Sequence, residues 1–290
     1  MRIGFYIFIL FQRLISLLPF RLIYVFSDFL YFILYYIIGY RKEVVFTNLR
    51  NSFPNKSEIE LKKIRRKYFR SLTDLILETI KCSHASSEQL SKRLKFKNGE
   101  VITDLVKANK SAFIMLGHTG NWELSGIVFP LIFNIKVFSI YQQQSNPYFD
   151  AYIKKLRGRF GAVPVVAQQS FRKFVEHKNE VTFNMVVGDQ APPESGDHYW
   201  CNFLNQETAF FTGTEKMAKT LNFAVVFASI SRTKRGYYEI EFKLITDNPK
   251  ETKENEITDK YVRNLEQFII KNPDNWLWSH RRWKRKRINN

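Results

Sequence analysis

The sequence predicts an α/β protein in which a mostly parallel central sheet is flanked by helices, with an N-terminal membrane-anchoring helical segment. Two observations predict this architecture. From Ala112 onward, short apolar runs typical of strands alternate with amphipathic segments typical of helices. Before residue 41 the chain is strongly apolar and aromatic. We therefore expect a membrane anchor at residues 1–40 and a catalytic domain at residues 41–290.

The apolar run from Leu22 to Tyr40 is long enough to cross a bilayer, with Asp28 as its one charged residue. As a helix it would extend about 28 Å, close to the thickness of the hydrocarbon core. Five tyrosines in the run also suit a helix in the membrane interface, where phenols settle at headgroup level. No small-residue cleavage site follows, which disfavours a cleaved signal peptide. A buried core helix is a further alternative, and the sequence does not decide between a spanning and an interfacial helix.

A capping-box pattern, Ser57-Glu58-Ile59-Glu60, predicts the start of a helix that continues to about Lys81. Apolar residues from Leu61 to Ile76 recur along one stripe of this helix. Six basic residues cover much of the remaining surface: Lys62, Lys63, Arg65, Arg66, Lys67 and Arg70. They form a solvated face or, if the helix lies beside a membrane, a binding surface for lipid phosphates.

The chain from Ala112 onward is expected to form the sheet. Strands are expected at Ala112–Gly117, Lys136–Tyr141, Val163–Val166, Thr182–Val187, Ala224–Ile230 and Tyr237–Leu244. Helices are expected at Trp122–Phe133, Pro147–Phe160, Phe171–His177, Thr212–Leu221 and Thr258–Lys271. The turn residues 234–236 separate the last two strands and predict a hairpin.

The segment Gly117-His118-Thr119-Gly120-Asn121-Trp122-Glu123 follows the strand at Ala112 directly. Ligands of open α/β sheets bind outside the carboxyl ends of strands, where His118, Tyr141 and Asp189 are expected to lie. We expect Glu123 to accept a hydrogen bond from one ring nitrogen of His118. The other nitrogen would then take the proton from a hydroxyl that attacks an acyl thioester. The alternative is that Glu123 caps the following helix.

Other catalytic classes find less support in the sequence. Gly-x-Ser-x-Gly is absent, which disfavours a serine hydrolase. Neither Cys82 nor Cys201 neighbours the histidine motif, and two cysteines provide no disulfide framework or Cys-x-x-Cys metal site. The five histidines show no metal-ligand spacing, so we expect no metal.

The chain is basic, with 45 Lys+Arg against 27 Asp+Glu and a net charge of +18. Such a charge attracts nucleic acid, anionic lipid headgroups or an acidic carrier protein. The apolar N-terminus and the absence of a recognisable binding module disfavour nucleic acid. We expect Arg281 and Arg282, which follow Trp276-Leu277-Trp278, to bind a phosphate of a substrate. A solvated basic tail is the alternative.

These motifs resemble those of the bacterial lipid A biosynthesis (lauroyl/myristoyl) acyltransferases, within the lysophospholipid acyltransferase superfamily. His118 and Glu123 match the superfamily's motif of His, four residues, then Asp or Glu. The resemblance covers nearly the whole chain, and its other segments are Leu18–Phe20, Asn48–Pro54, Asn146-Pro147, Arg157–Gly161, Asp189-Gln190, Phe203-Leu204, Thr212-Gly213 and Trp278–Lys284. The chain departs from the family pattern at Gln190 and at Gln142–Gln144, where acceptor recognition is expected.

The resemblance implies a donor, an acceptor and a set of site residues. The donor would be a thioester of acyl carrier protein or coenzyme A, and the acceptor a hydroxyl of a membrane lipid, in the first place a lipid A precursor. An aminolipid, a lysophospholipid or a pigment precursor is the alternative acceptor. The implied location is the cell inner membrane with the catalytic domain facing the cytoplasm, with no cofactor and no nucleic-acid partner. Catalytic roles fall to His118 and Glu123, and substrate-binding roles to Asn121, Arg157, Arg159, Asp189, Thr212, Arg281 and Arg282.

Overall fold

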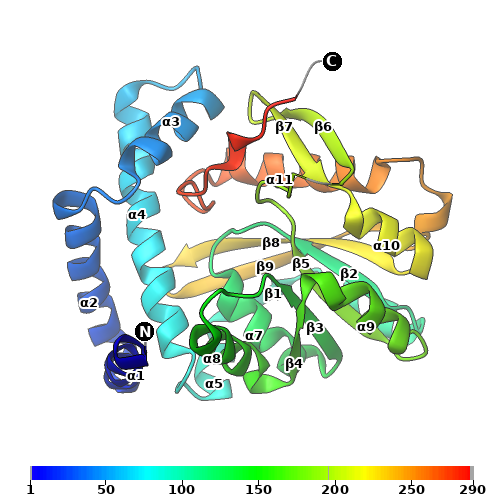
Figure 1. The fold of residues 1–290 in the computed structure, drawn as a ribbon, viewed down its shortest axis with the longest axis horizontal. Coiled ribbons are helices and arrows are strands. Elements are labelled where there is room, and N and C mark those ends of the chain that lie inside the picture. Colours follow the sequence, from blue (N-terminus) through cyan, green and yellow to red (C-terminus); the bar gives the residue numbers. More distant parts are fainter. Residues whose placement is uncertain (1, 195, 288–290) are drawn as a thin grey trace.

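The computed structural model describes residues 2–194 and 196–287 and confirms the α/β architecture (Figure 1). A seven-stranded sheet has the order β1-β9-β8-β2-β5-β3-β4, and the strands from β8 to β4 in this order are parallel to one another. Only the pairing of β8 with β9 is antiparallel among the described pairs of this sheet. The strands are β1 (Leu94–Lys97), β2 (Ala112–Leu116), β3 (Lys136–Tyr141), β4 (Ala162–Val166), β5 (Thr182–Val187), β8 (Ala224–Lys234) and β9 (Tyr237–Thr246). A separate antiparallel hairpin consists of β6 (His198–Phe203) and β7 (Gln206–Phe211).

Helices cover both faces of the sheet, because the apolar side chains of its buried strands point alternately to either side. In β2, Ala112, Ile114 and Leu116 belong to one core cluster and Phe113 and Met115 to the other. The first cluster includes side chains of α6 (Glu100–Lys107), α7 (Trp122–Phe133) and α8 (Pro147–Arg157). The second includes side chains of α9 (Ser170–Glu176), α10 (Gly213–Leu221) and α11 (Glu256–Lys271).

The N-terminal quarter of the chain is helical and lies along one side of the sheet (Figure 1). Its helices are α1 (Arg2–Leu17), α2 (Phe20–Phe32) with a π-helical extension η1 (Ile33–Ile37), α3 (Lys42–Ser52), α4 (Glu58–Lys81) and the short α5 (Ser87–Ser91). The predicted capping box opens α4, since the Ser57 hydroxyl accepts from the Glu60 N–H and the Glu60 carboxylate accepts from the Ser57 N–H.

Helix α2 lies against α4 and buries one face there. Ile23, Ser27, Tyr31 and Tyr35 are buried along that face, and Tyr31 and Tyr35 belong to the main core cluster. Among the described residues, Phe20–Ile37 is the one helix long and apolar enough to cross a membrane, with 22% of it buried within the protein. The boundary expected at residue 40 stays a prediction.

Candidate active site

The sheet register brings His118 and Asp189 together. Strands β2 and β5 are parallel neighbours, and Leu116, the last residue of β2, pairs with Val187, the last residue of β5. His118 and Asp189 each follow two residues later, at the carboxyl edge of the sheet. The Nδ1 atom of His118 lies 2.5 Å from Oδ1 of Asp189. The two residues form one unit although 71 positions separate them in the chain.

Asp189 is a buried carboxylate, and both of its oxygens accept hydrogen bonds. Its Oδ2 atom accepts from the backbone N–H of His118 at 2.8 Å and from the indole N–H of Trp276 at 2.6 Å. Burial acts to raise the pKa of Asp189, but the charge of His118 and these hydrogen bonds outweigh it and hold the pKa below its ordinary value. Asp189 is therefore ionised, and the N–H of His118 Nδ1 donates to it. That tautomer leaves the Nε2 atom of His118 as an acceptor.

His118 lines a cavity. The amide nitrogen of Gln190 lies 3.1 Å from Nε2, in position to donate to it. The cavity is narrow, about 20 Å³, with room for little more than one water molecule. His118, Trp122, Trp276 and Leu277 line the cavity. Arg232 also lines it and is the cation among its described lining residues. Its guanidinium is held by Ser71 and by Asp74 on α4.

A wider groove of about 470 Å³ lies next to this cavity. Leu72 and Leu277 line both spaces, and Gln190, which contacts His118, lines the groove. Leu34 of η1 and Ile76 of α4 add apolar walls. The groove thus connects the apolar N-terminal helices with the histidine.

The C-terminal segment closes over the carboxyl edge of the sheet. Asn275 accepts from the N–H of Gly120, and Trp276 forms a β-bridge with Thr119. The Asn48 side chain on α3 donates to the carbonyls of Trp278 and His280 at 2.9 and 3.0 Å. The Asn48–Pro54 motif and the Trp278–Lys284 motif therefore contact each other, and this contact holds the C-terminal segment in place.

Two glycines of the motif are required by close packing. A Cβ on Gly117 would lie 2.6 Å from Leu265 and 3.2 Å from the Asp189 carboxylate. Gly120 has a φ of +52°, and a Cβ there would lie 2.7 Å from the Ile230 carbonyl oxygen. A larger residue at Gly120 would displace the loop that carries His118, whereas one at Gly117 would first have to move the Leu265 side chain.

The expectation that Glu123 holds the imidazole is wrong in this structure. The Glu123 carboxylate instead forms a two-point ion pair with Arg157 at the end of α8, with Nε to Oε2 at 2.9 Å. The physical reason is that Glu123 lies in the first turn of α7 and points toward α8, whereas the His118 ring turns toward β5. The ring of Trp122 lies edge-on to His118, with ring centroids 4.9 Å apart.

Asn121 has a structural position. It is fully buried, its side-chain oxygen caps α7 by accepting from the Leu124 N–H, and its amide donates to Glu78 at 2.7 Å. Burial raises the pKa of Glu78, which also accepts from the Tyr238 hydroxyl. Both ends of the Asn121 amide are engaged, so this side chain does not face the cavity as a substrate ligand.

The other predicted binding residues are dispersed. The Arg159 guanidinium donates to the Cys82 carbonyl, and the Thr212 hydroxyl donates to the Asp197 carbonyl at 3.1 Å. Arg282 is 1% exposed, donates to the Ala209 carbonyl at 2.6 Å and lies over the Phe210 ring. Burial lowers its pKa to about 10. These contacts do not leave Arg282 free for a phosphate, whereas Arg281 is exposed.

The sequence did not single out His280, Trp276 or Arg232 as parts of one site. His280 lines the groove, and its Nε2 accepts from the Ala191 N–H at 3.1 Å. Burial lowers the pKa of His280 to about 4, so the ring is neutral and supports the segment that follows Asp189. The aromatic cluster around Trp278 was the one available signal, and it marked the segment without indicating its contacts.

A parallel sheet whose carboxyl edge carries a histidine held by a buried carboxylate, beside an apolar groove, is the arrangement of an α/β enzyme that handles apolar substrates. The chain belongs to the bacterial lipid A biosynthesis acyltransferase family, whose model matches residues 1–285. This match confirms the resemblance and identifies the protein as an acyltransferase of lipid A biosynthesis. A comparison with curated proteins finds no match.

Proposed function

We propose that the protein transfers a fatty acyl chain from a thioester of acyl carrier protein or coenzyme A to a hydroxyl of a lipid A precursor, with His118 as general base. The observation that carries this proposal is the His118–Asp189 pair, with Nδ1 and Oδ1 2.5 Å apart and His118 in the wall of the cavity. Family membership supports the reaction class and implies an acyl donor and a lipid A precursor. The enzyme acts at the cell inner membrane, with the catalytic domain facing the cytoplasm.

The chemistry requires one proton transfer and one acyl transfer. The acceptor hydroxyl takes the place of the Gln190 amide at Nε2 of His118 and gives up its proton there. The oxygen then attacks the thioester carbonyl, the carbon–sulfur bond breaks, and the thiolate leaves with the proton from the imidazolium. Asp189 stabilises the imidazolium while the proton is held. Arg232 supplies positive charge in the same cavity for the oxyanion that forms.

The apolar groove suits the acyl chain of the donor. Leu34, Leu72, Ile76 and Leu277 provide an apolar wall that ends at the cavity of His118. A chain in this groove would bring its thioester carbonyl to the histidine, while the acceptor approaches from the membrane. Glu123 follows Trp122 of the cavity wall and pairs with Arg157, and we assign these two residues a positioning role.

The test compares purified wild-type enzyme with His118→Ala and His118→Gln. With acyl-carrier-protein thioester and a lipid A precursor in mixed micelles, both variants should lose turnover by roughly 10²–10⁴-fold and stay folded, with a lowered melting temperature because the buried Asp189 carboxylate loses a hydrogen-bond partner. Near-normal turnover by a folded His118→Ala enzyme would refute the mechanism. If the wild type acylates a lysophospholipid or an aminolipid and ignores the lipid A precursor, the acceptor assignment is wrong while the mechanism stands.

A further inference from the structure

The N-terminal helices present a large apolar surface that the protein leaves uncovered. On α1, α2 and η1 several large apolar side chains are 46–68% exposed: Leu10, Leu14, Leu17, Leu22, Phe29 and Tyr36. Exposed apolar residues gathered on one face, rather than scattered singly, mark an interaction surface. The question is whether these helices cross the membrane or lie in its surface.

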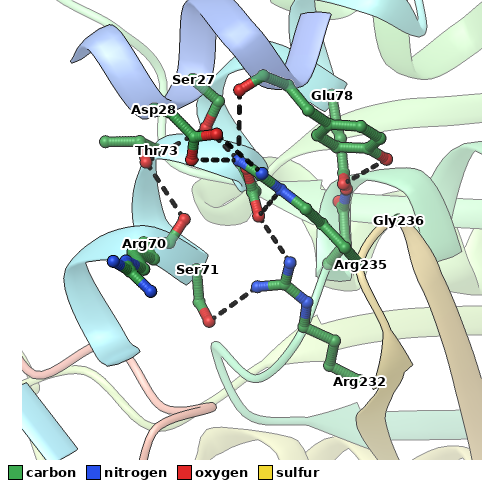
Figure 2. Close-up of polar contacts among 12 residues, drawn as sticks. Ser27, Asp28, Arg70, Ser71, Thr73, Glu78, Arg232, Arg235 and Gly236 are labelled. Atoms are coloured by element: carbon green, nitrogen blue, oxygen red, sulfur yellow. Dashed lines mark hydrogen bonds and ion pairs between the residues drawn. The ribbon is translucent and has the colours of Figure 1, made fainter. Parts of the chain in front are cut away.

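Helix α2 is fixed to the catalytic body through Asp28. Arg235 lies at the tip of the β8–β9 hairpin and donates to both Asp28 oxygens, at 2.7 and 3.0 Å. The same guanidinium donates to Asp74 on α4 and to the backbone carbonyl of Tyr24. Figure 2 shows Arg235 beside Asp28, and Arg232, which also donates to Asp74, near it.

This network conflicts with a spanning helix. Asp28 lies near the middle of Phe20–Ile37, so a helix that crossed the bilayer would carry Asp28 close to its centre. Arg235 would have to follow, together with the hairpin of the central sheet, and the polar edge of that sheet would enter the hydrocarbon. Ser27 adds to the conflict, since its hydroxyl bonds with Thr73 and Asp74 on α4.

Helix α1 is attached to the body as well. The centroid of the Phe8 ring lies 5.5 Å from that of Phe149 and 5.6 Å from that of Tyr152, both on α8. At the other end, the Lys81 ammonium donates to the Ser16 carbonyl at 2.6 Å. In Figure 1, α1 is seen nearly end-on and α2 runs lengthwise, both on the same outer side of the molecule. Two helices so arranged can both contact one flat surface on that side.

The charges around this surface match an anionic membrane. Arg13 and Arg21 are exposed on either side of the corner between α1 and α2. The exposed Arg70 lies 5.3 Å from the centre of the Tyr31 ring, and the Lys42 ammonium lies 4.4 Å from that of Tyr35. Basic side chains beside an exposed apolar face are typical of helices that bind an anionic bilayer surface.

We infer that α1 and α2 form a monotopic membrane-binding surface, which lies in one leaflet of an anionic bilayer without crossing it and is locked to the catalytic body by Arg235. This inference goes beyond the acyl-transfer reaction and holds for any acceptor. Its consequence is that the apolar groove, which begins at Leu34 of η1, opens at the membrane surface.

The test measures depth along α2. Leu22, Phe29 and Tyr36 are exposed and lie seven residues apart along α2 and η1. Each is replaced by cysteine, one at a time, in full-length Cys201→Ser protein, in which Cys82 is buried. A nitroxide label at each site is measured in vesicles of phosphatidylethanolamine and phosphatidylglycerol, from its relative accessibility to oxygen and to a water-soluble nickel complex. A label at Lys107→Cys, on the exposed surface of α6, provides the aqueous control.

An in-plane helix predicts similar, shallow depths at the three positions. A spanning helix predicts that the label at position 29 lies about 10 Å deeper than those at 22 and 36, because seven residues rise about 10 Å along a helix. That profile would overturn the inference. Three labels as accessible to nickel as the Lys107→Cys control would overturn it too, because this surface would then stay in water and not enter the membrane.

Discussion

Replacing Asp189 by Asn tests the catalytic pair most directly. The Asp189 carboxylate accepts three hydrogen bonds, two from His118 and one from Trp276. An Asn side chain keeps the shape, but one of its ends becomes a donor, so at least one N–H of these partners then faces another N–H. The negative charge that stabilises the imidazolium is lost as well. We therefore expect the tautomer of His118 needed for base catalysis to be disfavoured.

The expected magnitude follows from the role of the pair. Loss of a general base costs roughly 10²–10⁴-fold, and loss of an orienting carboxylate in a serine-protease triad costs about 10⁴-fold. We expect kcat of Asp189→Asn to fall by about 10³–10⁴-fold, or about 4–5.5 kcal/mol of transition-state stabilisation. The free energy of unfolding should fall by about 1.5–3 kcal/mol, the usual value for one buried hydrogen bond to a charged group.

The assay is transfer of a labelled acyl group to lipid in micelles, with the melting temperature measured on the same preparation. Glu215→Gln is the matched control, because Glu215 is also a buried carboxylate that accepts a backbone N–H and a hydroxyl, both from Thr258. The control should lose stability and keep turnover. A folded Asp189→Asn enzyme with turnover within a factor of ten of the wild type would refute the assigned role of Asp189.

Three further predictions concern residues around the pair. Glu123→Gln and Arg157→Gln should each lower kcat by about 10–100-fold, and the double variant should be no worse than either, because the two side chains act as one ion pair; additive losses would contradict this. His280→Gln should flatten the acid dependence of the melting temperature between about pH 6.5 and 4. The wild type loses stability there as pH falls, because the ring is protonated in the unfolded state but stays neutral in the folded state, where its pKa is lowered to about 4. An unchanged slope in the variant would exclude His280 as the source of this pH dependence. Arg282→Gln should lower the melting temperature, whereas Arg281→Gln should raise KM for one substrate and weaken its salt dependence; a salt-independent KM equal to that of the wild type would leave Arg281 without a binding role.

The strongly patterned elements were predictable from local sequence. β3, β5 and α7 have the predicted bounds, because their apolar runs are continuous and flanked by polar turns. The four-residue β1 (Leu94–Lys97) alternates with lysines and is strand only through its pairing with β9. The β6–β7 hairpin was also not predicted, since its sequence has no strong alternation and its conformation depends on packing against α11. Such short elements depend on tertiary contacts that a sequence window does not contain.

The partner of His118 could not be read from the motif. Local spacing favoured Glu123, five residues away, because a carboxylate so near in sequence is the simplest partner for an imidazole. The true neighbour depends on strand order, which places β5 beside β2 and brings Asp189 to the ring. Both residues were placed at carboxyl ends of strands, so the edge of the sheet was predictable. The adjacency of the two strands was not, since nothing in either strand's sequence specifies its neighbour.

Hydropathy alone does not distinguish a spanning helix from one that lies in the membrane surface, because both need a long apolar run. The distinguishing feature here is the single acidic residue in that run, and its meaning depends on Arg235, which is 207 residues away. Without that partner, Asp28 would be an unfavourable charge in a helix that otherwise fits the bilayer. With it, Asp28 becomes the point at which the helix is attached to the sheet, and the lipid-facing side of α2 is set by the side that the sheet and α4 already occupy. The same attachment fixes the groove that begins at Leu34 relative to His118, so the membrane surface and the base belong to one rigid body.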